Sequence, residues 1–200
     1  INNLQEWDWK DVNLSKESQG VKPHLKTDSV QYNVIQRLVQ QDYDIVYDDD
    51  NAGEIADVIT LKLVENEIHV ELYHLKFAYE GKITSQIVNF YEVCGQAQKS
   101  ANWKYKEPEE MLNHLLRREV KKNKNGDECS RIYKGTHVKL VELMKLAKRK
   151  LPVKYSVFIV QPGVSKDTAS DEILSLLGVT DSFLKDCTGI ELKVIVNKRD

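Results

Sequence analysis

Cysteine is scarce in this chain, and its placement excludes two common roles. Only 3 of the 200 residues are cysteine, at Cys94, Cys129 and Cys187, and no C-x-x-C pair occurs. An odd number of widely spaced cysteines supports neither a disulfide framework nor a zinc knuckle. Such cysteine usage is typical of a reducing compartment, so a cytoplasmic location is predicted.

Long hydrophobic runs are absent as well. No apolar run approaches the roughly 18 residues that cross a bilayer, and no basic-then-apolar leader opens the chain. A membrane is therefore not among the predicted partners. The first residue is Ile1 rather than methionine, which favours a segment cut from a longer protein.

A large net charge is also missing, but the formal balance of −2 hides a separation of charge. Residues 1–80 carry 7 basic and 16 acidic side chains, whereas residues 101–155 carry 15 basic and 7 acidic ones. A metal-dependent enzyme acting on a polyanion needs acids to hold cations and bases to hold phosphates. Two solvated, lysine-rich helices give the same counts, and charge alone favours that simpler interpretation.

The hydrophobic pattern predicts an α/β fold in which helices cover a central mixed sheet. Helices are predicted over residues 29–41, 84–101, 107–122, 136–150, 169–178 and 180–187. Strands are predicted over residues 43–50, 55–63, 68–77, 156–161 and 191–197. Residues 1–27 lack a sustained period and are interpreted as a lead-in segment that packs through its tryptophans. Residues 28–200 then form one domain, with a basic helical insertion at about 101–155.

Polar residues interrupt two of the predicted strands on faces that are otherwise apolar. Side chains alternate along a strand, so Asp57 shares a face with two isoleucines, and His74 and Lys76 share a face with Val70 and Leu72. An isolated buried charge costs several kcal/mol, so such residues need an opposite charge, a cation or water. If the two strands pair, the three side chains meet near one end of the sheet. A buried Asp–Lys pair that satisfies itself is the alternative interpretation.

These residues resemble the PD-(D/E)XK nuclease superfamily, the fold of restriction endonucleases and Holliday-junction resolvases. In that family an acid begins the second strand of a three-strand meander, and acid-x-lysine lies on the third. Asp57 in "GEIADV" matches the first acid and Lys76 in "HLK" the lysine, with Gln31 and Gln96 at accessory positions on flanking helices. Residues 28–196 also look like the C-terminal nuclease-like domain of some bacterial superfamily 2 helicases in defence or restriction systems.

One position departs from the family motif, because His74 stands where the family has Asp or Glu. Histidine binds Mn²⁺ and other transition ions, whereas Mg²⁺ prefers oxygen ligands. Three alternatives remain open: Glu54, Asp50 or Glu71 supplies the carboxylate, His74 is itself a ligand, or the site is inactive. Strand alternation places Glu71 on the wrong face, whereas Glu54 reaches the site if the strand starts with a bulge.

The resemblance implies hydrolysis of DNA phosphodiester bonds with Mg²⁺ or Mn²⁺. Asp57 would be the main metal ligand, with Glu54 or His74 assisting, and Lys76 would orient the attacking water and offset charge at the phosphate. The two glutamines would hold waters or a phosphate near the metal. Backbone phosphates are expected on two basic helices, at Arg117, Arg118, Lys121, Lys122 and Lys124, and at Lys145, Lys148, Arg149 and Lys150.

The sequence thus predicts a metal-dependent DNA endonuclease domain within a larger, helicase-containing defence or restriction protein. Its predicted partners are DNA and the helicase module of the same parent chain, and a homodimer is compatible with the sequence. The alternative is a catalytically inactive module of the same fold that binds DNA or a partner protein. Both predict salt-dependent DNA binding, and only the first predicts cleavage that requires Mn²⁺ or Mg²⁺.

Overall fold

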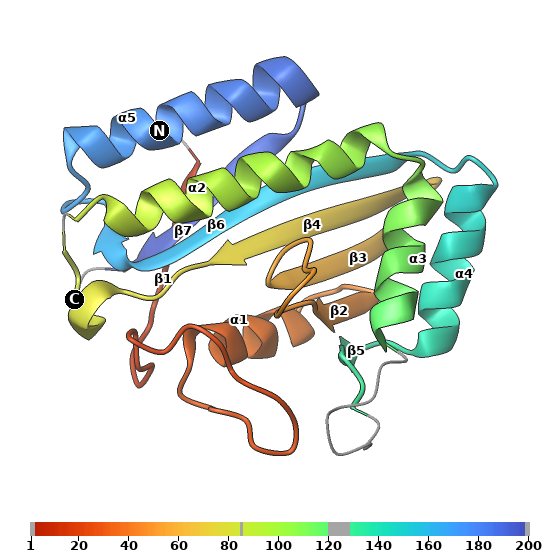
Figure 1. Ribbon diagram of the computed structural model, residues 1–200, viewed down its shortest axis with the longest axis horizontal. Coiled ribbons are helices and arrows are strands. Elements are labelled where there is room, and N and C mark those ends of the chain that lie inside the picture. The colour runs from red at the N-terminus through yellow and green to blue at the C-terminus, as the bar shows by residue number, and fades with distance from the viewer. Residues whose placement is uncertain (1–2, 85, 120–128, 199–200) are drawn as a thin grey trace.

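A computed structural model describes residues 3–84, 86–119 and 129–198 of the chain. Its centre is a sheet of 7 strands in the order β1-β7-β6-β4-β3-β2-β5 (Figure 1). The strands are β1 (Leu4–Trp7), β2 (Ile45–Asp48), β3 (Val58–Val64), β4 (Glu67–Leu75), β5 (Ile132–Lys134), β6 (Val153–Ser165) and β7 (Glu191–Asn197). The helices are α1 (Val30–Val39), α2 (Val88–Ser100), α3 (Pro108–Glu119), α4 (His137–Lys148) and α5 (Asp171–Phe183).

The sheet is mixed, as the sequence predicts. β2, β3 and β4 form an antiparallel meander, while β6 runs parallel to β4, and β7 runs parallel to both β6 and β1. The parallel strands are buried and nearly continuous in hydrophobic residues, which is typical of strands covered on both faces. The predicted α/β fold is therefore confirmed.

Helices cover both faces of this sheet (Figure 1). On one face, Val34 and Leu38 of α1 pack with Val46 and Tyr73 of the strands. On the other face, α2, α3, α4 and α5 contribute to one larger hydrophobic core. Among the described residues, no helix combines the length and apolar character needed to cross a membrane.

The N-terminal segment contributes a strand to the sheet instead of only leading into the domain. β1 pairs with β7 at one edge, and the side chain of Trp9, 4% exposed, joins the core on the α1 face. The predicted packing through a tryptophan is confirmed, but a four-residue strand was not expected there. Likewise β5, inside the predicted helical insertion, adds an edge strand beside β2.

Several predicted boundaries differ from the structure, and two of the differences have a clear physical reason. β3 begins at Val58 rather than residue 55, because the chain before it forms a loop in which Asn51 and Gly53 adopt positive φ. Helix α5 runs through Gly178 to Phe183 instead of ending at that glycine. A helix ends readily at glycine only where the backbone becomes left-handed, and here that occurs at Gly189 (φ 63°), after a π-helical turn over Leu184–Thr188.

Candidate functional site

The antiparallel meander brings three chain segments to one edge of the sheet. β2 ends at Asp48, β3 begins at Val58 and β4 ends at Leu75. Since β3 is antiparallel to both neighbours, the end of β2, the start of β3 and the end of β4 lie side by side. Asp57 immediately precedes β3 and Lys76 immediately follows β4, so the fold brings this predicted pair to the same edge.

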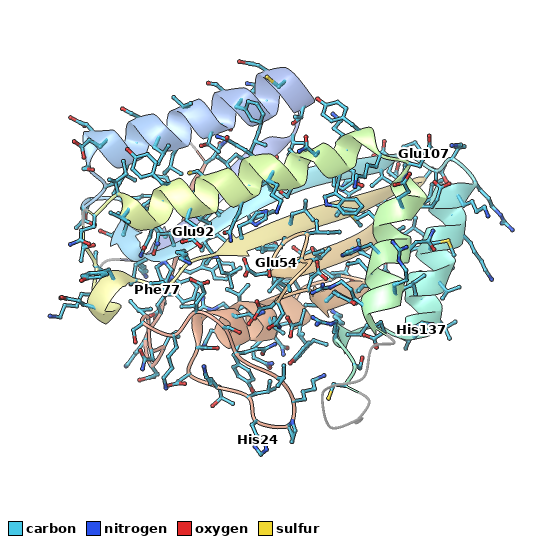
Figure 2. All side chains as sticks on the ribbon, in the orientation of Figure 1. His24, Glu54, Phe77, Glu92, Glu107 and His137 are labelled. Carbon is cyan, nitrogen blue, oxygen red and sulfur yellow. The ribbon has the colours of Figure 1, made fainter. Side chains whose placement is uncertain are left out.

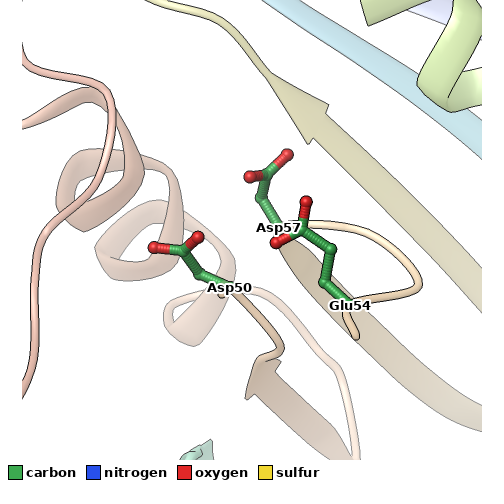
Figure 3. A group of neighbouring side chains, drawn as sticks. All are labelled: Asp50, Glu54 and Asp57. Atoms are coloured by element: carbon green, nitrogen blue, oxygen red, sulfur yellow. The ribbon is translucent and has the colours of Figure 1, made fainter. Parts of the chain in front are cut away.

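Three carboxylates converge at this edge, from Asp50, Glu54 and Asp57 (Figure 3). One oxygen of each lies within 4.8 Å of the others. Two oxygen ligands on opposite sides of a Mg²⁺ ion are about 4 Å apart, so small side-chain movements would place all three around one ion. The donor set therefore fits a hard divalent cation such as Mg²⁺ or Mn²⁺. We call these three residues the carboxylate cluster.

The electrostatics of the cluster favour a bound cation. Asp57 is buried, 8% exposed, and its Oδ2 accepts a hydrogen bond of 2.8 Å from the Leu75 N–H. Burial raises the pKa of Asp57 well above its ordinary value, the Leu75 N–H lowers it, and the nearby charges of Glu54 and Asp50 raise it further. Burial and the charge of Asp50 also raise the pKa of Glu54. A cation would relieve both effects, because it offsets the repulsion between ionised carboxylates.

Arg118 of α3 holds the loop that carries Asp50 and Glu54. This side chain is 5% exposed, and its Nε lies 2.5 Å from Oδ1 of Asp49. Its guanidinium also donates to the carbonyl oxygens of Ala52, Asp49 and Asp50, at 2.8, 2.5 and 3.0 Å. Five donors in a planar fork suit this multiple contact, which a lysine cannot reproduce.

Further contacts hold the same loop. Asp49 Oδ2 accepts the Ile55 N–H at 2.7 Å, which closes the loop on itself. Arg131 donates to the carbonyl of Asp50 at 3.0 Å, and the Nε2 of His114 lies 3.0 Å from the carbonyl oxygen of Gly53. These contacts preorganise the backbone that presents two of the three carboxylates.

Lys76 follows β4 at the same sheet edge, and its ammonium lies in a salt-bridge network that the sequence did not predict. Its Nζ lies 2.9 Å from Glu92 Oε1 on α2 and 3.2 Å from Oε2 of Glu17 in the N-terminal segment. Burial disfavours the charged ammonium, but Glu92 and Glu17 outweigh it, so the pKa of Lys76 is raised. Lys76 is therefore protonated at neutral pH and suits charge stabilisation rather than proton abstraction. Figure 2 labels Glu92 on α2 and Glu54 over the sheet.

His74 faces α2. Among the described residues, the carboxylate cluster consists of Asp50, Glu54 and Asp57 and does not include His74. Its side chain is 2% exposed, and its Nε2 lies 2.9 Å from the Ser100 hydroxyl, which itself donates to the Ala97 carbonyl. The ring nitrogen is therefore the donor in this pair. Burial lowers the pKa of His74 to about 3, so the imidazole is neutral at physiological pH.

The carboxylates around Asp57 come from the loop rather than from the neighbouring strand. Of the three acids considered, Glu54 and Asp50 lie in the cluster. Glu71 lies on the α1 face instead, where it accepts hydrogen bonds from Tyr43 (2.6 Å) and Tyr73 (2.7 Å). The predicted face of Glu71 is confirmed.

The two accessory glutamines have different surroundings. Gln31 is buried on α1, where its amide accepts from the Gln19 N–H at 2.8 Å and donates to Asp48 at 3.0 Å. It belongs to a hydrogen-bond network behind the loop and not to the cluster. Gln96 lines a hollow together with Glu54 and His74, so the predicted position of Gln96 near the site agrees with the structure.

The predicted phosphate-binding residues divide into three groups. Arg118 does not lie on an exposed basic face as predicted, because its guanidinium is committed to the loop. Lys121, Lys122 and Lys124 lie outside the described residues. The exposed members are Arg117 on α3, and Lys145, Lys148, Arg149 and Lys150 on or just after α4. Lys150 forms a salt bridge of 2.7 Å with Glu107.

The comparisons with known proteins leave the chain without an assigned family. No protein-family model, curated protein or solved structure matches it. Function must therefore be inferred from the geometry of the site and the chemistry of its residues.

Proposed function

We propose that this chain is a metal-dependent nuclease domain of the PD-(D/E)XK type that hydrolyses phosphodiester bonds in DNA. The observation that carries this proposal is the convergence of Asp50, Glu54 and Asp57 within 4.8 Å, at the sheet edge where β4 delivers Lys76. Carboxylates beside a lysine at the end of an antiparallel meander are the arrangement that the sequence motif implies. The mixed sheet with helices on both faces is compatible with that superfamily.

The roles of the residues follow from their surroundings. The carboxylate cluster would hold one Mg²⁺ or Mn²⁺ ion, which supplies charge stabilisation at the phosphate and acidifies water. Lys76, protonated because Glu92 and Glu17 accompany it, would donate to a phosphate oxygen and offset charge in the transition state. Gln96 would orient a water or a phosphate at the margin of the site. Asp57, with the highest burial of the three acids, would be the main ligand.

The proposal is tested by nicking of supercoiled plasmid DNA in Mn²⁺, in Mg²⁺ and in EDTA. The unmutated chain should nick DNA with at least one of the two ions, and it should not nick DNA in EDTA. Asp57→Asn and Lys76→Ala should both abolish nicking, but only the first should abolish metal binding. The nuclease proposal would be refuted if the unmutated chain is folded and binds Mn²⁺ but cleaves no DNA with either ion.

A specific observation favours the second candidate, a nuclease-fold module that binds DNA or a protein without cutting. His74 stands at the acidic position of the motif and is hydrogen-bonded inside the protein, and Lys76 is engaged by two carboxylates. A relic site would keep such pairs for stability alone. It predicts salt-dependent DNA binding without cleavage in any metal, and an unfolding temperature insensitive to Mn²⁺.

The proposal also includes a larger polypeptide of which this chain is one part. The resemblance to the nuclease-like domains of superfamily 2 helicases suggests that this chain acts beside a helicase module of the same polypeptide. In that arrangement the helicase would deliver DNA to the sheet edge that carries the carboxylate cluster. A homodimer would bring two such sites together, one from each copy of the chain.

A further inference from the structure

Two adjoining hollows lead away from the carboxylate cluster, and together we call them the Trp103 groove. The inner hollow, about 430 Å³, includes Glu54 and Gln96 in its lining. The outer hollow, about 930 Å³, lies between α3 and α4 and reaches His137. Trp103 and Lys106 line both hollows, so the indole stands where they meet. Figure 2 labels Glu54 and His137, which mark the two ends. Both volumes fall in the range of about 300–1,000 Å³ typical of pockets for small ligands.

The indole of Trp103 is held in place but not enclosed. It lies in the 3₁₀ turn Ala101–Tyr105 between α2 and α3 and packs partly against the core. The His114 ring lies against it, with the ring centroids 5.4 Å apart. The Lys106 ammonium lies 3.9 Å from the indole centroid, and this lysine is exposed. A cation–π contact at an exposed site is weak, so a flat ligand can displace the lysine from the ring.

The charges of the groove favour an anionic ligand. Lys99 lines the inner hollow, Arg117 lines the outer one, and Lys106 lines both. The carboxylates in the linings are Glu110 in the outer hollow and Glu54 at the inner end, where the latter belongs to the carboxylate cluster. Cations on either side of an aromatic ring are the arrangement that binds single-stranded nucleic acid, in which bases stack and phosphates pair with basic side chains.

Gln96 adds a polar feature to the inner hollow. Among the described residues, its buried Oε1 has no hydrogen-bond partner. A buried acceptor without a partner is unfavourable, and an N–H donor of a ligand in the inner hollow would relieve it after a small rotation of the amide. The exocyclic amines and ring N–H groups of nucleobases are donors of this kind.

We propose that the Trp103 groove binds an unpaired nucleotide of the strand whose phosphate lies at the carboxylate cluster. Its base stacks on Trp103 in place of the Lys106 ammonium, and its phosphates contact Lys99 and Lys106. The base must be unpaired, because base faces inside a duplex are covered by their neighbours. This inference rests on the proposed function for the identity of the ligand, and it makes the preferred substrate single-stranded or locally opened DNA.

The test is binding of the full chain to a fluorescent 12-nucleotide oligothymidine in EDTA and low salt, where no cleavage occurs. Trp103→Ala should weaken binding by between about 5-fold and about 150-fold, the range expected for loss of one base–aromatic stack. Trp103→Phe keeps an aromatic face and should restore most of the affinity. A matched control is Tyr91→Ala, since Tyr91 is a 61% exposed aromatic residue on α2 outside the groove, and this change should have no effect.

Two further arms separate stacking from charge. Lys99→Gln combined with Lys106→Gln should lower the slope of log affinity against log salt by about 1.4, or about 0.7 for each phosphate contact on a single strand. Binding of a duplex of the same sequence should be insensitive to Trp103→Ala. If Trp103→Ala does not fold, the parent chain is compared on oligothymidine and on the same strand with abasic sugars, which should bind at least 5-fold more weakly.

The proposal is overturned if folded Trp103→Ala binds the single strand as tightly as the parent, or if single strand and duplex are weakened equally. Equal binding of the abasic and the intact strand would also overturn it. Cleavage is not measured in this experiment. A chain that cuts no DNA can therefore still bind an unpaired base in the Trp103 groove, and a chain that cuts DNA can fail to bind one there.

Discussion

Arg118 and Asp49 form a buried ion pair directly beneath the loop that carries two of the three clustered carboxylates. The Nε of Arg118 lies 2.5 Å from Oδ1 of Asp49, and the Asp49 side chain is fully buried. The pair joins α3, inside the basic segment over residues 101–155, to the acidic segment after β2. The charge separation along the chain therefore includes a contact that shapes the site, in addition to any role in binding polyanions.

Arg118→Ala should destabilise the protein and disorganise the loop. Burial raises the pKa of Asp49 to about 7 even beside Arg118, so without the guanidinium this carboxyl group would take up a proton. Loss of the ion pair and of the donor to the Ala52 and Asp49 carbonyls should cost about 3–5 kcal/mol. Urea unfolding should show this loss, and Mn²⁺ affinity of the folded fraction should also fall, because Asp50 and Glu54 lose their fixed backbone. Arg117→Ala is the matched control, an exposed change on the same helix that should stay within about 0.5 kcal/mol. Unchanged Mn²⁺ affinity in folded Arg118→Ala would mean that the clamp has no effect on the site.

Asp57→Asn should stabilise the metal-free protein at neutral pH. Burial raises the pKa of Asp57 in the folded state. The folded chain therefore binds this proton more tightly than the unfolded chain. The corresponding stability is complete below the ordinary value of 3.8 and is lost as pH rises through the folded-state pKa. Melting curves in EDTA should show the variant above the parent at pH 7, with the difference vanishing at low pH. A parent that melts higher at pH 7 in EDTA would identify Asp57 as part of a stabilising structural pair.

His74→Gln should leave Mn²⁺ affinity within about threefold of the parent value, because the amide can donate to Ser100 in place of the imidazole. His74→Ala should lower the free energy of unfolding by about 1–3 kcal/mol, the usual cost of leaving a buried polar group, here the Ser100 oxygen, without its partner. Calorimetric Mn²⁺ titration and urea unfolding measure the two effects separately. If His74→Gln weakens Mn²⁺ binding as much as Asp57→Asn does, the imidazole is a metal ligand.

Charge reversal on α4 should weaken DNA binding without changing sequence preference. Lys145, Lys148 and Arg149 are exposed, and replacing all three by Glu should lower the salt slope on duplex DNA by up to about 2.7, or about 0.9 per phosphate contact. Lys185→Glu, an exposed change on the turn after α5, is the control. An unchanged affinity at low salt would show that this basic surface is solvated and not a DNA contact.

Local sequence patterns predicted most of the fold, because its strands and helices have clear periods. The strand over residues 191–197 is as expected, and α1 (Val30–Val39) falls within the predicted helix over residues 29–41. β1 and β5 were missed because strands of 4 and 3 residues at a sheet edge depend on tertiary pairing, which no local period records. The end of α5 was misplaced because Gly178 carries no steric or conformational demand in this helix.

The site was predictable only in part, for a similar physical reason. Strand alternation was enough to relate Asp57 to Lys76 and to exclude Glu71. Glu17 and Glu92 could not be paired with Lys76 from sequence, since they come from an aperiodic segment and from an exposed helix position. Arg118 was interpreted as one more surface cation because of its charge. Its spacing of three residues from Leu115 and seven from Met111 nevertheless places it on the buried face of α3.

The central claim is that Asp50, Glu54 and Asp57 together bind one divalent ion. The most direct measurement is calorimetric titration of Mn²⁺ into the full chain and into Asp57→Asn at pH 7, with melting curves to confirm that both are folded. The account predicts one saturable binding event per chain in the parent and its loss in Asp57→Asn. No binding by the parent, or equal affinity in the two proteins, would contradict it.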